Sequence, residues 1–436
     1  MMKKMHSLDR SILRLALPSI VSNITVPLLG LCDVAIMGHV GRAAGIGAIA
    51  VGSMIFNVMY WLFVFLRMST SGLTAQAYGA GLQLETCRIL RRSLSVALAF
   101  GAAIVLLQVP LRWLTFWLMQ ATGDVEQLCL PYYYICVWGA PAVLGLYVLS
   151  GWLVGMQDTR VPMWIAIGQN VVNIGVSLLL VVGFGWGICG VAIGTLVAQW
   201  AGFITGLVMV RAKSKTCMVA TPDDTLSPSS FSLRATFRIN LDIFLRTVCL
   251  VSVNLYFTSA GAAQGTYILA ANTLLMQFFT FYSYMMDGFA FAGEALAGRY
   301  LGAADRQMLG RTVRRLFCWG VGVALLFTVA YLLGGTTLLR LLTNDADVVV
   351  TARHYLPWAV AIPVAGMAAF VWDGIFIGTT RSRGMLVSCF WAAASFFVIL
   401  LLFFPLWQNH ALWLALIVYL ALRGLLQTAI WNKMPC

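Results

Sequence analysis

Long apolar runs separated by short polar breaks make up most of the chain. About 20 apolar residues in a helix cross about 30 Å of hydrocarbon, because each residue adds 1.5 Å. Twelve such runs predict twelve transmembrane helices, so we expect an all-α integral membrane protein. The expected spans are 15–38, 46–70, 94–118, 128–154, 161–182, 188–210, 239–260, 267–293, 316–338, 353–377, 385–405 and 410–430.

The longest polar segment, residues 213–238, separates the sixth span from the seventh. It contains Pro222 and Pro228 among Ser, Thr and Asp residues, a composition typical of a linker. We therefore expect an N-lobe over 1–212 and a C-lobe over 239–436, each with six spans.

The two halves share residues at a nearly constant offset, which predicts an internal duplication. Paired bundles of this kind normally enclose a central cleft in which transporters bind substrate and alternate access. We expect two pseudo-symmetric six-helix bundles. The matches 223 residues apart are Gly79-Ala80 with Gly302-Ala303, Arg91-Arg92 with Arg314-Arg315, Gly151 with Gly374, Gly155 with Gly378, and Arg160 with Arg383.

Composition excludes a soluble protein, since 61% of the residues are hydrophobic, 10% are charged and the mean hydropathy is +0.88. The net charge of +13 could suit nucleic acid, but 20 of the 28 basic residues fall on the side of the termini. The positive-inside rule then places both termini and the linker in the cytoplasm. We expect a monomeric multi-pass protein of the inner (plasma) membrane, in contact with the lipid bilayer and without a nucleic-acid partner.

Motifs for catalysis and metal binding are absent from the sequence. The ten cysteines are scattered singly, the four histidines are isolated, and neither HExxH nor GxSxG occurs. We expect no enzyme activity, no metal and no cofactor.

Several charged residues lie inside the predicted spans, where a carboxylate costs about 2.5–3.5 kcal/mol and needs a partner, water or a proton. Such residues are either contacts between helices or parts of a transport path. For Asp373, an ion pair with the nearby Arg381 or Arg383 and a transport role are both open. The set is Asp33, Arg67, Arg246, Asp287, Glu294 and Asp373.

Asp33 is the strongest candidate for ion coupling, because it lies mid-span with basic residues only towards the two membrane faces. An apolar environment disfavours the charged form of a carboxylate, so Asp33 could bind and release a proton as its access to water changes. Pro27 on the same span predicts a kink or hinge. The residues of this half expected to line a cleft beside Asp33 are Asn23, Thr25, Pro27, Arg67, Asn170, Asn173 and Ser177.

A second group of candidates lies on the eighth span. Asp287 and Glu294 are seven residues apart, so both can face the interior. The surrounding run 276–291 is rich in Met and aromatic residues, which indicates either lipid-facing packing or a deformable pocket for hydrophobic cations. The pocket would include Met276, Phe279, Tyr284 and Met286.

Stretches in both halves resemble the multidrug and toxic compound extrusion (MATE) family, in particular its DinF branch. The resemblance implies two six-helix lobes that form a V around a cleft. It also implies export of organic cations or other amphipathic compounds in exchange for protons or sodium. The matching stretches are 18–41, 65–80, 149–162, 242–246, 285–295, 372–383 and 409–425.

The resemblance assigns the coupling carboxylate to Asp33 and an accompanying asparagine to Asn173. Related sequences carry an aspartate four positions further on, where this chain has Ser177. Either Asp33 acts without a second N-lobe carboxylate, or Asp287 and Glu294 share the coupling. The alternative function is a flippase for a lipid-linked precursor, but a flippase favours a cationic cleft, and the intramembrane charges here are mostly acidic.

Overall fold

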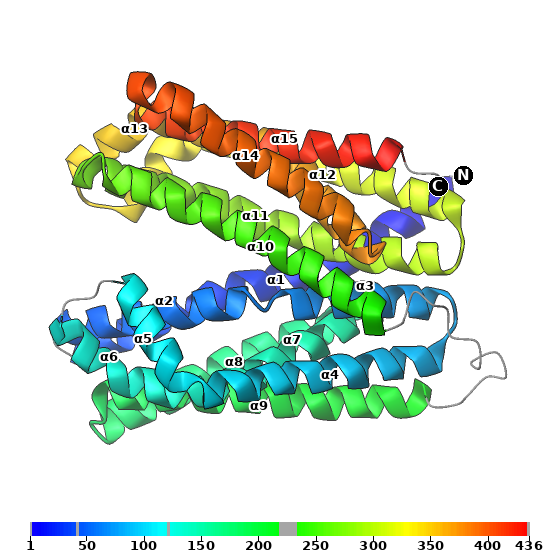
Figure 1. The fold of residues 1–436 in the computed structure, drawn as a ribbon, viewed down its shortest axis with the longest axis horizontal. Coiled ribbons are helices and arrows are strands. Elements are labelled where there is room, and N and C mark those ends of the chain that lie inside the picture. The colour runs from blue at the N-terminus through cyan, green and yellow to red at the C-terminus, as the bar shows by residue number, and fades with distance from the viewer. Residues whose placement is uncertain (1, 41–42, 120–122, 218–232, 434–436) are drawn as a thin grey trace. The chain divides into compact units, whose positions relative to one another are not determined.

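The computed structural model describes residues 2–40, 43–119, 123–217 and 233–433, which are almost entirely helical (Figure 1). No strand occurs in these ranges, so the predicted all-α class is confirmed. The α-helices are α1 Met2–Val40, α2 Ala43–Trp61, α3 Phe65–Gly79, α4 Gln83–Leu106, α5 Gln108–Met119, α6 Gly123–Cys136, α7 Ala140–Gly155, α8 Arg160–Leu178, α9 Gly187–Cys217, α10 Leu233–Ala262, α11 Thr266–Gly302, α12 Arg306–Leu342, α13 Ala346–Gly378, α14 Ser382–Trp407 and α15 Asn409–Asn432.

Ten segments of the described chain are long and apolar enough to cross a membrane. The helices α1 and α11, with 39 and 37 residues, cover the two other predicted spans. Three predicted spans each contain two helices, namely α2 with α3, α4 with α5, and α6 with α7. Hydropathy therefore located the spans, but it did not locate these breaks between helices.

The backbone repeats the offset that the sequence shows. Three pairs of turn residues, each 223 positions apart, adopt positive φ angles, although the residue types within a pair differ. A positive φ is costly for residues other than glycine, so its recurrence indicates that the same turns were retained in both halves. The pairs are Gly81 with Ala304, Gln157 with Thr380, and Gly185 with Gln408.

Contacts divide the chain into two compact units, Val21–Ser232 and Met1–Ile20 with Leu233–Cys436. The first half of α1 thus packs with the C-terminal unit, whereas the sequence analysis assigned all of 1–212 to one lobe. Close packing explains the difference, because a Cβ on Gly288 would lie 2.3 Å from the Ile20 side chain. The middle of the predicted linker, residues 218–232, lies outside the described part, and α9 and α10 enter its two ends.

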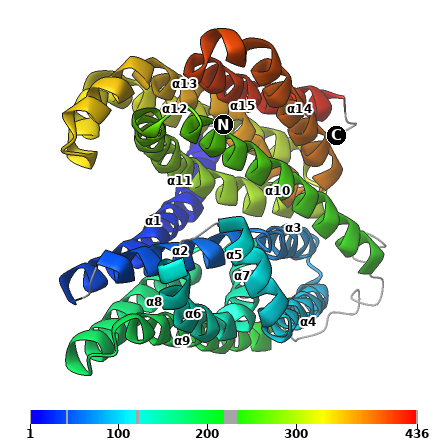
Figure 2. The same cartoon turned by 60° about the vertical axis from the view of Figure 1, so that its left-hand side comes forward.

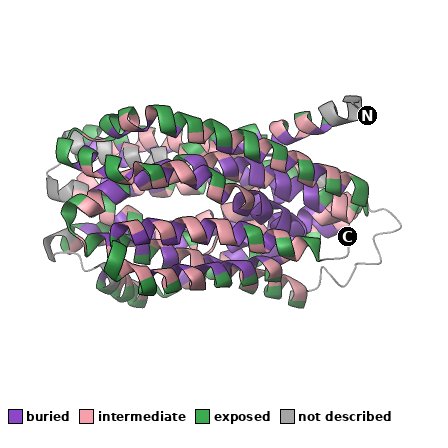
Figure 3. Cartoon of the chain, turned by 90° about the horizontal axis from the view of Figure 1, so that it is seen from above, coloured by how far each residue is buried: buried purple, intermediate pink, exposed green. Residues whose placement is uncertain are grey.

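One central helix organises each unit. In the second unit, α13 packs against α11, α12 and α15 (Figure 2). In the other unit, α7 packs against α3, α4 and α9. In the most apolar 18-residue stretch of each helix, 67% of the residues are buried in α13 but 22% in α12. Exposed residues lie on the outer helix faces (Figure 3). The central helices therefore form the cores of the two units.

The repeated glycines explain how each central helix approaches its neighbour. A Cβ on Gly374 of α13 would lie 2.1 Å from the carbonyl oxygen of Ala290 on α11. A Cβ on Gly151 of α7, the matching residue, would lie 2.3 Å from the carbonyl oxygen of Arg67 on α3. Because real Cβ atoms do not approach so closely, both positions require glycine.

Candidate ion-coupling site

Asp33 on α1 is buried, with 1% of its surface exposed, inside the unit formed by Val21–Ser232. Its Oδ2 atom lies 3.2 Å from the hydroxyl oxygen of Thr195 on α9, which can donate a hydrogen bond to it. Asp33 forms no ion pair with any described residue. The predicted inward orientation of this carboxylate therefore agrees with its position in the structure.

Asn173 on α8 reaches the same hydroxyl group, since its Nδ2 atom donates to Thr195 Oγ1 over 3.1 Å. Ser177, one helical turn further on, is fully buried against Gly194. A Cβ on Gly194 would lie 2.1 Å from Ser177 Oγ, so this glycine permits the close approach of α8 and α9. The local sequence thus brings Asp33, Asn173 and Ser177 to one polar region.

Three buried oxygen atoms in this region have no hydrogen-bond partner among the described residues. They are Asp33 Oδ1, Asn173 Oδ1 and Ser177 Oγ. An unsatisfied buried polar group costs about 1–3 kcal/mol, so this arrangement favours a further proton or cation. These oxygens are the atoms here to which a proton or a small cation could bind.

The Thr195 hydroxyl fits both protonation states of Asp33. It carries one hydrogen, and two acceptors lie within reach, Asp33 Oδ2 at 3.2 Å and the carbonyl oxygen of Val191 at 3.1 Å. Ionised Asp33 can accept this hydrogen, whereas protonated Asp33 can donate to the hydroxyl while the hydroxyl donates to Val191. The heavy atoms need not move between the two patterns.

The other N-terminal candidates lie in the same unit. Asn170 donates from Nδ2 to the carbonyl oxygen of Thr25 over 2.9 Å, and thereby joins α8 to α1. Asn23 and Arg67 are half-buried, whereas the side chain of Pro27 lies outside the described part. These contacts join α1 to α8, and the assignment of these residues to a substrate cleft stays a prediction.

The C-terminal candidates belong to the other unit. Glu294 and Met286 on α11 are fully buried, whereas Asp287 is half-buried. Phe279 contacts the ring of Phe370, with centroids 6.2 Å apart. The pocket residues Met276, Phe279 and Tyr284 are half-buried, and the coupling and substrate roles of this set stay predictions.

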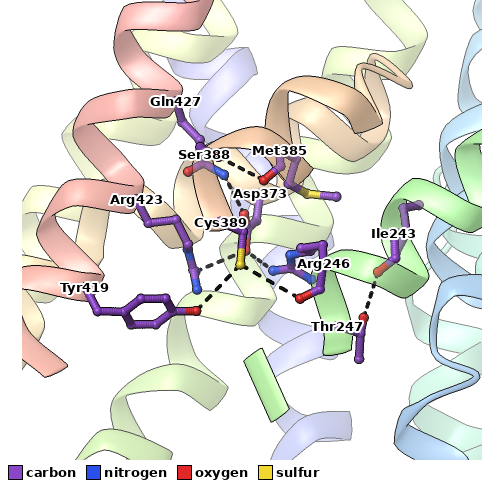
Figure 4. A network of polar contacts seen from close by, with 10 residues as sticks. All are labelled: Ile243, Arg246, Thr247, Asp373, Met385, Ser388, Cys389, Tyr419, Arg423 and Gln427. Carbon is purple, nitrogen blue, oxygen red and sulfur yellow. Dashed lines mark hydrogen bonds and ion pairs between the residues drawn. The ribbon is translucent and has the colours of Figure 1, made fainter. Parts of the chain in front are cut away.

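Asp373 has different partners from those that the sequence suggested. Its carboxylate pairs with Arg246 of α10 and with Arg423 of α15, the latter at 3.1 Å, and accepts a hydrogen bond from Gln427 at 2.8 Å (Figure 4). The interpretation that Asp373 pairs with Arg381 or Arg383 is therefore wrong. Proximity in sequence was misleading, because helix packing brings residues 127 and 50 positions away to this carboxylate.

Aromatic rings complete this network. The guanidinium carbon of Arg423 lies 5.8 Å from the ring centroids of both Phe370 and Tyr419. Each ring face attracts a cation, which compensates the second arginine in a network with only one carboxylate. The network links α10, α13 and α15 within one unit, and we interpret it as a structural element.

Sequence reasoning missed Thr195, the direct partner of Asp33. Thr195 lies 162 residues from Asp33 and 22 from Asn173, and threonine is common in membrane helices. No local spacing distinguishes it from the other hydroxyl residues of the chain. The only available signal was its place on the helix that follows Asn173.

The duplicated all-α body, its membrane-crossing helices and its family together define a membrane transporter of the MATE fold. The chain belongs to the MatE family, whose model matches it twice, over residues 18–179 and 243–403. The double match confirms the predicted duplication and the resemblance.

The chain is 41% identical over 98% of its length to DNA damage-inducible protein F of Escherichia coli (strain K12), of which it covers 93%. It is 23% identical over 88% of its length to a probable multidrug resistance protein NorM of Thermotoga maritima, covering 82% of it. Among solved structures, the Vibrio cholerae MATE transporter VcmN in the bent form has a TM-score of 0.88 at 20% identity. That match covers 99% of this chain and 98% of the other, and it shows the shared fold.

Proposed function

We propose that the protein is a secondary active exporter that moves organic cations or other amphipathic compounds out of the cytoplasm. Export is coupled to the entry of protons, with sodium as the second candidate ion. Asp33 is the coupling carboxylate, and transport proceeds by alternating access. Both termini are cytoplasmic, and the membrane is the inner (plasma) membrane.

The observation that carries this proposal is the contrast between two buried carboxylates. Asp373 has two guanidinium partners, so its charge is neutralised permanently. Asp33 interacts only with uncharged groups, the hydroxyl of Thr195 and the side chain of Asn173, and its Oδ1 atom accepts no hydrogen bond among the described residues. A buried carboxylate without a fixed counter-ion must take up a mobile positive charge or remain at high energy.

This requirement supplies the coupling. A proton and a cationic substrate compete for the same negative charge, so binding of either lowers the affinity for the other. A proton gradient can then drive substrate release, because protonation removes the charge that holds the substrate. Thr195 maintains a satisfied hydrogen bond in both states, which lets Asp33 change its charge without unfolding the site.

The substrate class follows from relatives rather than from the geometry of this chain. The Thermotoga maritima relative is described as a probable multidrug resistance protein. A further solved structure of the same fold, with a TM-score of 0.85 at 18% identity, is described as a multidrug resistance MATE family transporter. We therefore extend export of chemically varied compounds to this protein.

The decisive experiment measures efflux of a fluorescent organic cation from proteoliposomes under an imposed pH gradient. We expect Asp33→Asn to abolish gradient-driven efflux, because an amide side chain stays neutral and cannot gain or lose a proton as a carboxylate does. Asp287→Asn is the comparison in the other unit: retained coupling there would show that Asp33 acts without Asp287, and reduced coupling would show that Asp287 shares the task. Unchanged coupling in Asp33→Asn, with the protein correctly inserted, would overturn the assignment of this residue.

A second pair of measurements distinguishes the ions. Ser177 contributes an unpaired oxygen that could ligate sodium but has no part in proton transfer to Asp33. Ser177→Ala should leave proton-driven efflux nearly unchanged. If sodium is the coupling ion, the same substitution should raise the sodium concentration that gives half-maximal efflux about tenfold, the factor for one lost contact worth about 1.4 kcal/mol.

A further inference from the structure

A chain of hydrogen bonds joins α13 to the start of α15 in the second unit. The indole nitrogen of Trp358 lies 3.0 Å from Nδ1 of His410, and Nε2 of His410 lies 3.1 Å from Nε2 of His354. His354 and Trp358 are four residues apart on α13, so they lie on one helix face. The imidazole of His410 is thus held at both nitrogens by α13.

The donor inventory determines which nitrogen of His410 carries hydrogen. An indole N–H can only donate, so Nδ1 of His410 must be the acceptor and carry no hydrogen. The hydrogen of neutral His410 is then on Nε2 and is donated to Nε2 of His354. His354 in turn carries its hydrogen on Nδ1, and at both contacts each donor faces an acceptor.

The same argument disfavours a metal site at these two rings. Two imidazole nitrogens 3.1 Å apart could both reach a zinc ion at about 2.0–2.1 Å from each. A metal on Nε2 of His410 would, however, require a hydrogen on Nδ1, directed at the N–H of Trp358. Metal-ligating histidines normally donate from the other ring nitrogen, and here that nitrogen faces a donor.

Water and protons can reach this site. His354, His410 and Trp358 line a surface cavity of about 530 Å³, together with Tyr355 and Gln408. His354 is exposed, and Arg353 shares an adjacent cavity with it. No carboxylate among the described residues forms an ion pair with either imidazole, so a protonated ring would gain no compensating partner here.

We propose that the hydrogen bonds that join His410 to Trp358 and His354 form a proton-sensitive connection between α13 and α15. We call this connection the clasp. The clasp is closed when both imidazoles are neutral. A proton added to Nδ1 of His410 faces the N–H of Trp358, and a proton added to Nε2 of His354 faces the N–H of His410. Either addition places two donors against each other and breaks the hydrogen bond between them. The clasp is a regulatory element of the proposed exporter, and only its effect on transport depends on that function.

The direct test is solid-state NMR of the full chain in lipid bilayers with ¹⁵N-labelled histidine. The chain has four histidines, so His354→Gln and His410→Gln assign the relevant signals. At pH 7.5 we expect His410 to carry hydrogen on Nε2 alone, and on acidification the two rings should change together. In Trp358→Phe, His410 should populate both neutral forms, because the donor that selects one is lost.

Three NMR results would overturn the proposal. These are hydrogen on Nδ1 of neutral His410, an unchanged population of neutral forms in Trp358→Phe, or a shift of both Nε2 signals on addition of equimolar zinc chloride. The zinc result would instead identify a metal site. None of these measurements requires transport, so failure of the proposed export function leaves the test intact.

Hydrogen exchange of the unaltered chain gives a second measurement that needs no variant. Between pH 7.5 and 5.5, after correction for intrinsic rates, exchange in the first turn of α15 should rise about tenfold, since two hydrogen bonds are lost. The matched control is the first turn of α9, because the turn at Gly185 repeats that at Gln408 and Gly187 stands where α15 has His410. An equal rise in both turns would contradict the clasp.

Discussion

The network around Asp373 permits a prediction whose sign follows from counting charges. In the unaltered chain, one carboxylate faces the guanidinium groups of Arg246 and Arg423, and the net charge is +1. Asp373→Asn raises that charge to +2 and removes the negative charge that both arginines face. Arg246→Met lowers the charge to zero and leaves Asp373 with Arg423 and Gln427. We therefore expect Asp373→Asn to be the more destabilising change.

The magnitude follows from burial. The side chains of Asp373, Arg246 and Arg423 are 10%, 6% and 4% exposed, so water hardly screens them. Removing one partner of such a pair costs about 3–5 kcal/mol, because the remaining charge stays buried without compensation. We expect this loss for Asp373→Asn and about 1–3 kcal/mol for Arg246→Met, which leaves a paired network. The double variant should be more stable than Asp373→Asn.

Thermal unfolding in a single detergent at pH 7, followed by far-ultraviolet circular dichroism, ranks these variants. The matched control is Arg306→Met, which removes an exposed arginine at the start of α12 and should change little. A larger loss in Arg246→Met than in Asp373→Asn, or no loss in Asp373→Asn, would refute the reasoning from charge.

Three further predictions concern packing, acid stability and the site. Gly374→Ala should reduce the free energy of unfolding by about 1–3 kcal/mol, because the added methyl group forces α13 away from Ala290. The control, Gly322→Ala, has open space around it and should not destabilise the protein. Thermal unfolding compares the two variants. Burial tends to raise the pKa of Asp158, but Lys213 and the N–H groups at the start of α8 outweigh it and hold that pKa below its ordinary value. The stabilisation from this lowered pKa is complete above about pH 4 and disappears as the pH falls through the lowered pKa. Asp158→Asn should therefore reduce the free energy of unfolding by about 0.5–1 kcal/mol at pH 7 and leave it unchanged in strong acid. Unfolding measured across this pH range tests the prediction. Thr195→Val should slow efflux about tenfold by leaving Asn173 and Asp33 unsatisfied, and Thr195→Ser should retain it.

The sequence alone determined the class of fold. A transmembrane helix needs only its own apolar length, because its backbone hydrogen bonds are internal, and so hydropathy identified the spans. The duplication was also visible locally, since Gly151 and Gly374 recur at a fixed offset and have the same packing role. The choice of Asp33 followed from the cost of a carboxylate in hydrocarbon, which depends on its position along one helix.

Only the tertiary structure decided which residues meet. Asp33 contacts Thr195 across 162 residues, and Asp373 selects Arg246 and Arg423 rather than the arginines close to it in sequence. Periodicity shows which face a residue occupies, but it does not show which helix lies opposite. Partners are chosen by the packing of whole helices, where glycines set the distances and each buried polar group must find the donor or charge that the neighbouring helix provides.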